Sequence, residues 1–177
     1  MSQPQTPSPA KLVIGLFMKE KDLFSPVASA LADRFGAIDM ISRWLPFDYT
    51  IYYEPEMGAP LNRRMLVFKQ LIEQEDLPGI KQITNEIEIG HAVEGKRRVN
   101  IDPGYLLHER FVLATGKNFT HRIYLGQGIY ADLTLIYTKG GFQTLPWTYP
   151  DYASDNMIGF LREVRKKYTI DLKSMAR

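Results

Sequence analysis

The chain contains no cysteine in its 177 residues, which excludes disulfides, thiolate-bound metals and a cysteine nucleophile. Histidine is also scarce, since only His91, His108 and His121 occur. None of the three belongs to a His-x3-His pair or a His-Glu-x-x-His sequence, the patterns that bind zinc from one helix. A dedicated zinc site is therefore not expected.

No apolar run approaches the roughly 20 residues that a membrane-spanning helix needs. The first ten residues, MSQPQTPSPA, lack the basic start and the apolar core of a secretory signal. We therefore expect a cytoplasmic protein with no membrane partner. Its residues 1–10 are expected to form a disordered arm, and residues 11–177 a single globular domain of ordinary size.

Neither sign of charge dominates, because 22 lysines and arginines face 20 aspartates and glutamates. A net charge of +2 is too small to indicate a nucleic-acid partner, so RNA binding is a weak alternative that depends on local basic residues. A phosphate-binding loop is also missing. The sequence ATGKN contains the Gly116-Lys117 pair, but Phe111 stands where that loop needs its first glycine.

The apolar patterns predict an alternation of strands and helices. Strands are expected at 12–18, 97–102, 110–115, 121–125 and 129–137, with the last two joined as a hairpin across GQG, and two extended pieces within 37–53. The segment RRMLVFKQLI fits either a helix or a buried strand, and we favour the strand. Helices are expected from Ser25, as the cap, to Gly36, from Pro78 to Gly90 or Gly95, and over a closing stripe that includes Met157 and Tyr168.

This order predicts an α+β fold with a mostly antiparallel sheet. The first part reads strand-helix-strand-strand-helix-strand, as in a ferredoxin-like unit, and a β-hairpin and a C-terminal helix follow it.

The stretch RVNIDPGYL carries the most informative polar pattern. Alternation along a strand places Arg98, Asn100 and Asp102 on one face, while Val99 and Ile101 face the other. Directly afterwards, the Pro-Gly pair is typical of a type II turn in which Asp102 is the first residue. A second polar row is expected along IYADLTL, where Asp132 alternates with apolar residues.

We therefore consider a polar cleft that binds a small anionic molecule, in a protein that could be an enzyme. Arginine, lysine and histidine would hold a phosphate or carboxylate, and carboxylates would bind a cation or transfer protons. The bland alternative is a solvated sheet face with cross-strand ion pairs. The sequence leaves the reaction, cofactor, metal and oligomeric state open. The candidate ligand-binding residues are Glu56, Glu86, Arg98, Asn100, Asp102, Lys117, His121, Arg122 and Asp132.

A function of another class is also possible. The aromatic, proline-rich loop FQTLPWTYPDY and the basic closing helix could form a surface for a protein partner, because tryptophan, tyrosine and arginine are common at interface hot spots. This interaction hypothesis predicts that Trp147, Tyr149 and Tyr152 form one exposed patch.

Several stretches, taken in order, resemble one known family. FDYTIYYEPEMG, TNEIE, VNIDPGYL, ATGKN, HRIYLGQGIYADLTL and WTYPDY are similar to an uncharacterised bacterial domain-of-unknown-function family, number 4416. The resemblance spans nearly the whole chain from about Lys11. It implies no established activity and assigns no catalytic residue. A GTP-binding label accompanies some such proteins, so GTP binding is a further weak alternative for a chain that lacks the phosphate loop.

Overall fold

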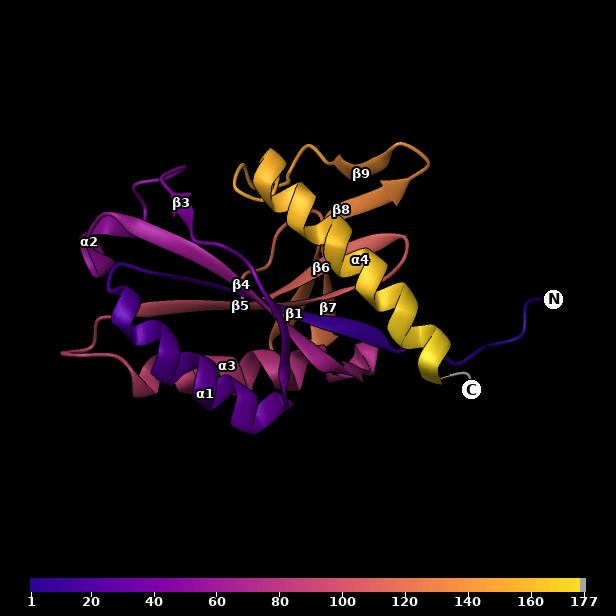
Figure 1. Ribbon diagram of the computed structural model, residues 1–177, viewed down its shortest axis with the longest axis horizontal. Helices are drawn as coiled ribbons and strands as arrows, with labels where there is room; N and C mark the ends of the chain where they lie inside the picture. The colour runs from indigo at the N-terminus through magenta and orange to yellow at the C-terminus, as the bar shows by residue number, and fades with distance from the viewer. Residues whose placement is uncertain (176–177) are drawn as a thin grey trace.

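A computed structural model describes residues 1–175, so residues 176 and 177 of the expected domain lie outside the described residues. Its centre is a nine-stranded sheet with the strand order β2-β4-β1-β5-β6-β8-β7, in which β3 also pairs with β4 and β9 with β8 (Figure 1). All pairings between the described strands are antiparallel.

The first part of the chain builds a ferredoxin-like unit. Its main elements are β1 (Ala10–Met18), α1 (Phe24–Phe35), β2 (Ile38–Ile41), β4 (Leu61–Ile72), α3 (Leu77–Gly90) and β5 (Val99–Leu106), and the short β3 (Leu45–Phe47) and α2 (Glu54–Met57) lie between β2 and β4. The segment RRMLVFKQLI is a strand, as favoured. The predicted α+β fold with this unit at its start is confirmed.

The second part extends the sheet and closes with one long helix. It contains β6 (Arg110–Thr115), β7 (Arg122–Gly126), β8 (Ile129–Thr138), β9 (Gly141–Thr144) and α4 (Asp155–Met175). The hairpin of β7 and β8 forms as predicted, but β9 falls in a segment that was expected to be a loop. Within residues 1–175, none of the helices combines the length and the apolar character of a membrane span.

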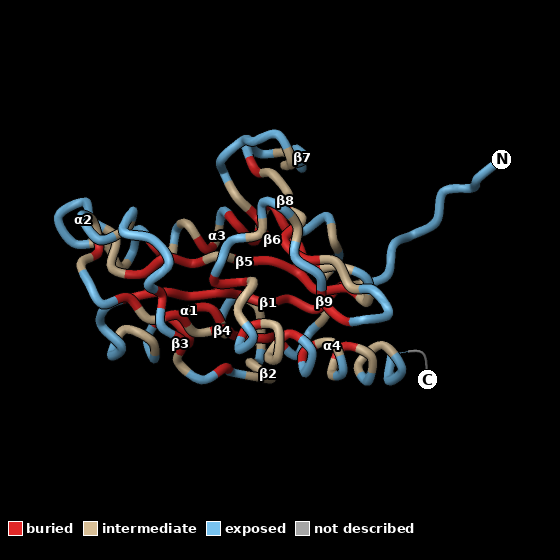
Figure 2. The backbone as a smooth tube through the Cα atoms, turned by 90° about the horizontal axis from the view of Figure 1, so that it is seen from above, coloured by how far each residue is buried: buried red, intermediate tan, exposed pale blue. Residues whose placement is uncertain are grey.

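Helices cover both faces of the sheet. Figure 1 shows α1 and α3 on one face and α4 across the other. Along the fully buried β1, Leu12, Ile14 and Leu16 belong to the core beneath α1 and α3, whereas Val13 belongs to the core beneath α4. Each such buried side chain stabilises the fold by about 1.5–3 kcal/mol, and Figure 2 shows the resulting band of buried backbone through the central strands.

Two local predictions fail at the ends of elements. Ser25 was expected to cap α1, but the helix begins at Phe24 and no side chain caps it, because a short 3-10 turn at Lys21–Leu23 leads into it. At the other end Gly36 ends the helix as predicted, with a φ of 85° that favours glycine.

The type II turn predicted at Asp102 is also wrong. Strand β5 continues through Pro103 and Gly104 to Leu106, and all of these residues pair with β1. Gly104 is needed for packing and not for a turn, since a Cβ there would lie 2.3 Å from the carbonyl oxygen of Val112 on β6. The tertiary contact with β6 therefore overrides the local turn signal.

Candidate functional site

The site begins where β5 and β6 cease to pair. Their pairing covers Gly104–Leu106 and Phe111–Leu113 and does not continue to the first half of β5. The N–H and C=O groups of Ile101 face away from β1, and alternation places the backbone nitrogen of Pro103 on the same side. Because proline has no N–H to donate, the ladder with β6 stops at this residue.

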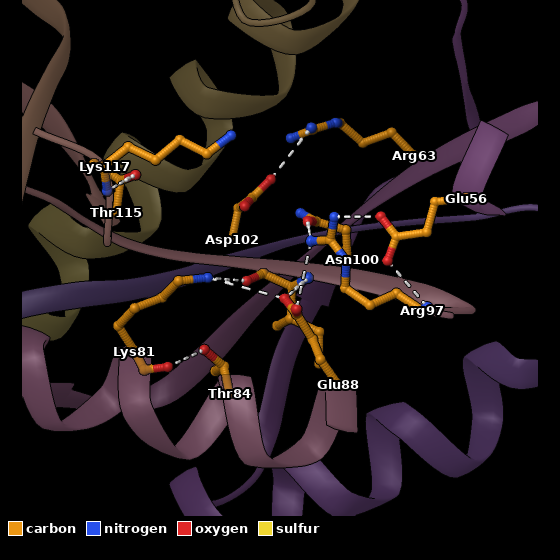
Figure 3. Close-up of polar contacts among 11 residues, drawn as sticks. Glu56, Arg63, Lys81, Thr84, Glu88, Arg97, Asn100, Asp102, Thr115 and Lys117 are labelled. Carbon is orange, nitrogen blue, oxygen red and sulfur yellow. Dashed lines mark hydrogen bonds and ion pairs between the residues drawn. The ribbon is translucent and has the colours of Figure 1, made fainter. Parts of the chain in front are cut away.

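At Ile101, where β6 does not pair with β5, side chains of α3 form hydrogen bonds with the backbone. Glu88 Oε1 accepts the N–H of Ile101 at 2.6 Å, and Lys81 Nζ donates to its carbonyl oxygen at 2.8 Å. Lys81 and Glu88 also form an ion pair at 3.9 Å. Figure 3 shows both side chains rising from α3 toward β5. Because β5 and β6 separate here, the charged side chains of Lys81 and Glu88 from the α3 face lie close to polar side chains of the α4 face.

A cavity of about 770 Å³ occupies this opening, within the range of about 300–1,000 Å³ that is usual for small-molecule sites. Side chains from β4, α3, β5, β6, β7 and β8 and from the loops at 49–53 and 149–152 line it. Antiparallel pairing explains why they meet, because Arg63, Phe17 and Asn100 are direct partners across β4, β1 and β5 and so share one face.

Arg63 forms the buried floor of the cavity. Its Nη1 donates to the hydroxyl of Tyr152 at 2.7 Å, and Nη2 lies 3.5 Å from Asp102 Oδ2. Nε lies 3.0 Å from Asp151 Oδ2, and because no hydrogen bond joins the two atoms, this contact is an ion pair. The guanidinium also lies 4.8 Å from the ring centroid of Phe47, within cation–π distance.

Gly15 makes this floor possible. It lies opposite Met65 on one side and Asp102 on the other. A Cβ at this position would be 3.0 Å from Arg63 Nη1 and 3.0 Å from the Tyr152 hydroxyl. The glycine therefore leaves the space through which Arg63 reaches across β1 to Asp102.

Arg97 organises the side of the cavity nearest α3. It binds both carboxylate oxygens of Glu56, with Nε to Oε1 at 2.8 Å and Nη2 to Oε2 at 2.7 Å. Its Nη1 donates to Asn100 Oδ1 at 2.9 Å and lies 3.8 Å from Glu88 Oε2. Since arginine can only donate, this bond fixes the orientation of the Asn100 amide.

Asp132 organises the opposite wall and is almost fully buried. Its Oδ2 accepts from Arg122 Nε at 2.8 Å and lies 3.2 Å from His121 Nε2. Arg122 also donates to the carbonyl oxygen of Lys117 at 2.9 Å and to the hydroxyl of Tyr149 at 2.9 Å. These bonds hold the turn that carries Lys117 against the cavity.

Burial changes the acidity of several groups around the cavity. Burial raises the pKa of Glu88 despite the nearby charge of Lys81, and burial raises the pKa of Asp151 despite Arg63. The Tyr53 hydroxyl is shifted to a pKa of about 12, mainly by burial and then by the charge of Asp102. In contrast, the hydrogen bonds from Arg97 lower the pKa of the more exposed Glu56.

The loop before α4 covers part of the sheet and does not form a free patch. Trp147 Nε1 donates to the carbonyl oxygen of Leu133 at 2.8 Å, and the Trp147 ring stacks on His121 with centroids 4.8 Å apart. Tyr152 is buried, whereas Tyr149 is half exposed and lines the cavity. Asp151, the acidic residue of this loop, forms an ion pair with Arg63. At the start of α4, the Ser154 hydroxyl accepts a hydrogen bond from the Met157 N–H.

The structure gathers most of the residues singled out from the sequence. Asn100, Asp102, Lys117, Arg122 and Asp132 line the cavity. Glu56 and His121 stand behind it and bind the lining residues Arg97 and Asp132.

Two candidates lie elsewhere. Glu86 is exposed on α3 and does not line the cavity. Arg98 pairs with Glu20 at 2.5 Å on the surface, because the regular alternation of β5 begins only at Val99.

The candidates chosen from the sequence include Glu86 of α3 and leave out the polar side chains of that helix that come through the opening in the sheet. Lys81, Asn85 and Glu88 recur at spacings of four and three and so form one stripe of α3, which is the signal that could have found them. Arg63 was missed because it lies in a strand whose other residues are mostly apolar. The convergence of carboxylates that could hold a hard cation does not occur, since residues 1–175 contain no group of three or more acidic or histidine side chains suited to a metal ion.

The fold and the cavity define an α+β protein built on a ferredoxin-like unit, with a polar cavity at a break in the sheet. A family model described as a domain of unknown function (DUF4416) matches residues 8–168. The chain belongs to this family, which confirms the resemblance seen in the sequence. Comparisons with curated proteins and with solved structures gave no match.

Proposed function

We propose that this protein binds a small anionic organic molecule in the cavity between β5 and β6. The observation that supports the proposal is the convergence of charged and polar side chains from separate elements on one space of about 770 Å³. A solvated sheet face would leave such groups on the surface, whereas these groups surround a common volume. The protein would bind this ligand in the cytoplasm, which is the location expected from the sequence.

The balance of charges favours an anion. Four of the five lining cations already have carboxylate partners: Arg63, Lys81, Arg97 and Arg122. The fifth is Lys117, whose ammonium group forms no hydrogen bond or ion pair with any residue of the described chain and lies 5.0 Å from the Tyr52 ring centroid. A phosphate or carboxylate of the ligand would therefore bind at Lys117.

The experiment is isothermal titration calorimetry with phosphorylated and carboxylated metabolites, comparing the wild type with Lys117→Gln. We expect at least one anion to bind saturably, with about tenfold weaker binding to Lys117→Gln because one charged hydrogen bond is lost. Lys139→Gln is the matched control, since Lys139 is exposed and outside the cavity. The proposal fails if no anion binds, or if Lys117→Gln and Lys139→Gln bind equally well.

The interaction hypothesis has less support. Of its three aromatic residues, Tyr152 is buried and Trp147 is bonded to β8. On the closing helix, Arg165 donates to the carbonyl oxygen of His108, and Lys167 pairs with Asp39. The residues proposed for partner binding are therefore largely used in internal contacts.

A further inference from the structure

The inner part of the cavity presents one acceptor and one donor that the protein leaves incompletely used. Asp102 lines the cavity with its carboxylate about a quarter exposed (28%), and its closest charged contact is Arg63 Nη2 at 3.5 Å. Asn100 is buried, and its Nδ2 has no hydrogen-bond partner within the described chain. Both belong to the same face of β5, two residues apart.

Rotating the Asn100 amide by half a turn would not give its Nδ2 group a partner. Arg97 Nη1 must face an acceptor, so Oδ1 points to Arg97 and Nδ2 points away. Asn100 and Asp102 both line the cavity, and Figure 3 shows the Asn100 amide on the side of Asp102. An unpaired buried donor is costly, and a ligand oxygen that accepts from it would remove this cost. Since Nδ2 is closed to bulk water, contact requires a small side-chain movement, which is common on binding.

We infer that the ligand is a hydroxyl-bearing anion of the sugar phosphate or sugar acid class, held by neighbouring hydroxyl groups at Asp102 and Asn100 and by its anionic group at Lys117. This inference depends on the proposed function and names its ligand class. A hydroxyl group donates to the Asp102 carboxylate and accepts from Asn100 Nδ2, so a pair of hydroxyls meets both needs.

Other ligand groups fit this end of the cavity less well. A phosphate or carboxylate would face the Asp102 charge. An ammonium group could bind Asp102, but it would lie near the Arg63 guanidinium and would leave Asn100 Nδ2 without an acceptor. A flat base would be held best between two parallel rings, yet the lining rings of Tyr52 and Tyr53 are nearly perpendicular, at 87°.

The test compares chemically matched probes by calorimetry: ribose 5-phosphate, gluconate, phenyl phosphate, O-phosphoethanolamine and orotate, which is a flat base with a carboxylate and no sugar hydroxyls. We expect ribose 5-phosphate or gluconate to bind at least tenfold more tightly than the other three. Whichever of these two binds more tightly tells whether the ligand is a sugar phosphate or a sugar acid. Tighter binding of phosphoethanolamine or of orotate would assign this end to an amine or a base and would overturn the inference.

Variants separate this inference from the proposed function. Asp102→Asn and Asn100→Ala should each weaken the sugar anion about tenfold and leave phenyl phosphate unchanged. Asp33→Asn, an exposed carboxylate on α1, is the matched control, and thermal unfolding verifies that each variant is folded. If sugar anions and phenyl phosphate bind with equal affinity and equal dependence on Lys117, this inference fails while the proposed function stands. If no probe binds the wild type, both fail.

Discussion

Two polar clusters lie on the α4 face of this sheet, near opposite ends of β1, and they differ in how completely their groups are paired. At one end, the fully buried Lys11 binds Asp39 at 3.0 Å, Asp171 at 2.6 Å and the carbonyl oxygen of Lys69 at 3.3 Å. Lys167 provides a second cation for the two carboxylates.

The Arg63 cluster at the other end is different. It contains the weakly bound Asp102 carboxylate, and Asn100 beside it has an orphaned Nδ2. Complete pairing is what a structural cluster requires, because every unmatched buried group costs stability. The Lys11 cluster thus holds α4 and β2 against β1, and the difference supports the proposal that the Arg63 cluster belongs to a ligand site.

The largest effect is expected from breaking the complete cluster. Lys11→Met should lower the free energy of unfolding by about 2–4 kcal/mol, because it leaves two carboxylates with a single cation. Urea unfolding measures the change, and Lys69→Met is the control, because the Lys69 side chain is exposed near the end of β4. Ligand binding should be unchanged. A loss below about 0.5 kcal/mol, the size of an ordinary surface effect, would show that the cluster is not structural.

Acid should destabilise the same cluster. Burial alone would raise the pKa of Asp39 and Asp171, but the hydrogen bonds and charges of Lys167 and Lys11 outweigh it and lower both values. A carboxyl group whose folded-state pKa is lowered stabilises the fold above its unfolded pKa of about 3.9, and this contribution disappears as the pH falls through the folded value.

The free energy of unfolding should therefore decline with acidification below about pH 5, and less steeply in Lys11→Met. Urea unfolding at a series of pH values gives both slopes. Identical slopes for the two proteins would contradict the assignment of this acid sensitivity to the Lys11 cluster.

The smallest effect on stability is expected at the incomplete cluster. Asp102→Asn should change the free energy of unfolding by no more than about 1 kcal/mol, because its carboxylate is partly exposed and its ion pair with Arg63 is long. The same variant is expected to weaken sugar anion binding. A loss as large as that of Lys11→Met would instead make Asp102 part of the structural framework.

The order of helices and strands was predicted from the sequence better than the residues at which individual elements begin and end. Helical and strand periodicity, together with element order, was sufficient for the ferredoxin-like unit and the hairpin, because those signals act over many residues. The Pro103-Gly104 pair led to the wrong prediction of a turn, since a short sequence signal cannot show that β6 packs against Gly104. Similarly, the capping signal of Ser25 was overridden by the turn before α1.

The candidate site was predictable in part, since Lys117, Arg122 and Asp132 were chosen together with polar residues of β5 and line the same cavity. Alternation correctly placed Asn100 and Asp102 on one face, as their shared register with β1 shows. Lys81 and Glu88 could not be assigned in this way, because they meet the strand through a gap that exists only after β5 and β6 separate. Arg63 reaches Asp102 from β4 across β1, which depends on the pairing of three strands. A single sequence shows which residues share an element and does not show where two elements part.

The most direct test of the central claim is a nuclear magnetic resonance titration of the wild-type protein with ribose 5-phosphate and gluconate. If the incompletely paired cluster is the ligand site, the side-chain amide of Asn100 and the backbone amides of Asp102 and Lys117 will shift together, with one saturable affinity. The amides around Lys11 will remain in place. Shifts confined to α4 or to the β7 edge, or no saturable shift at the three cavity residues, would contradict the account.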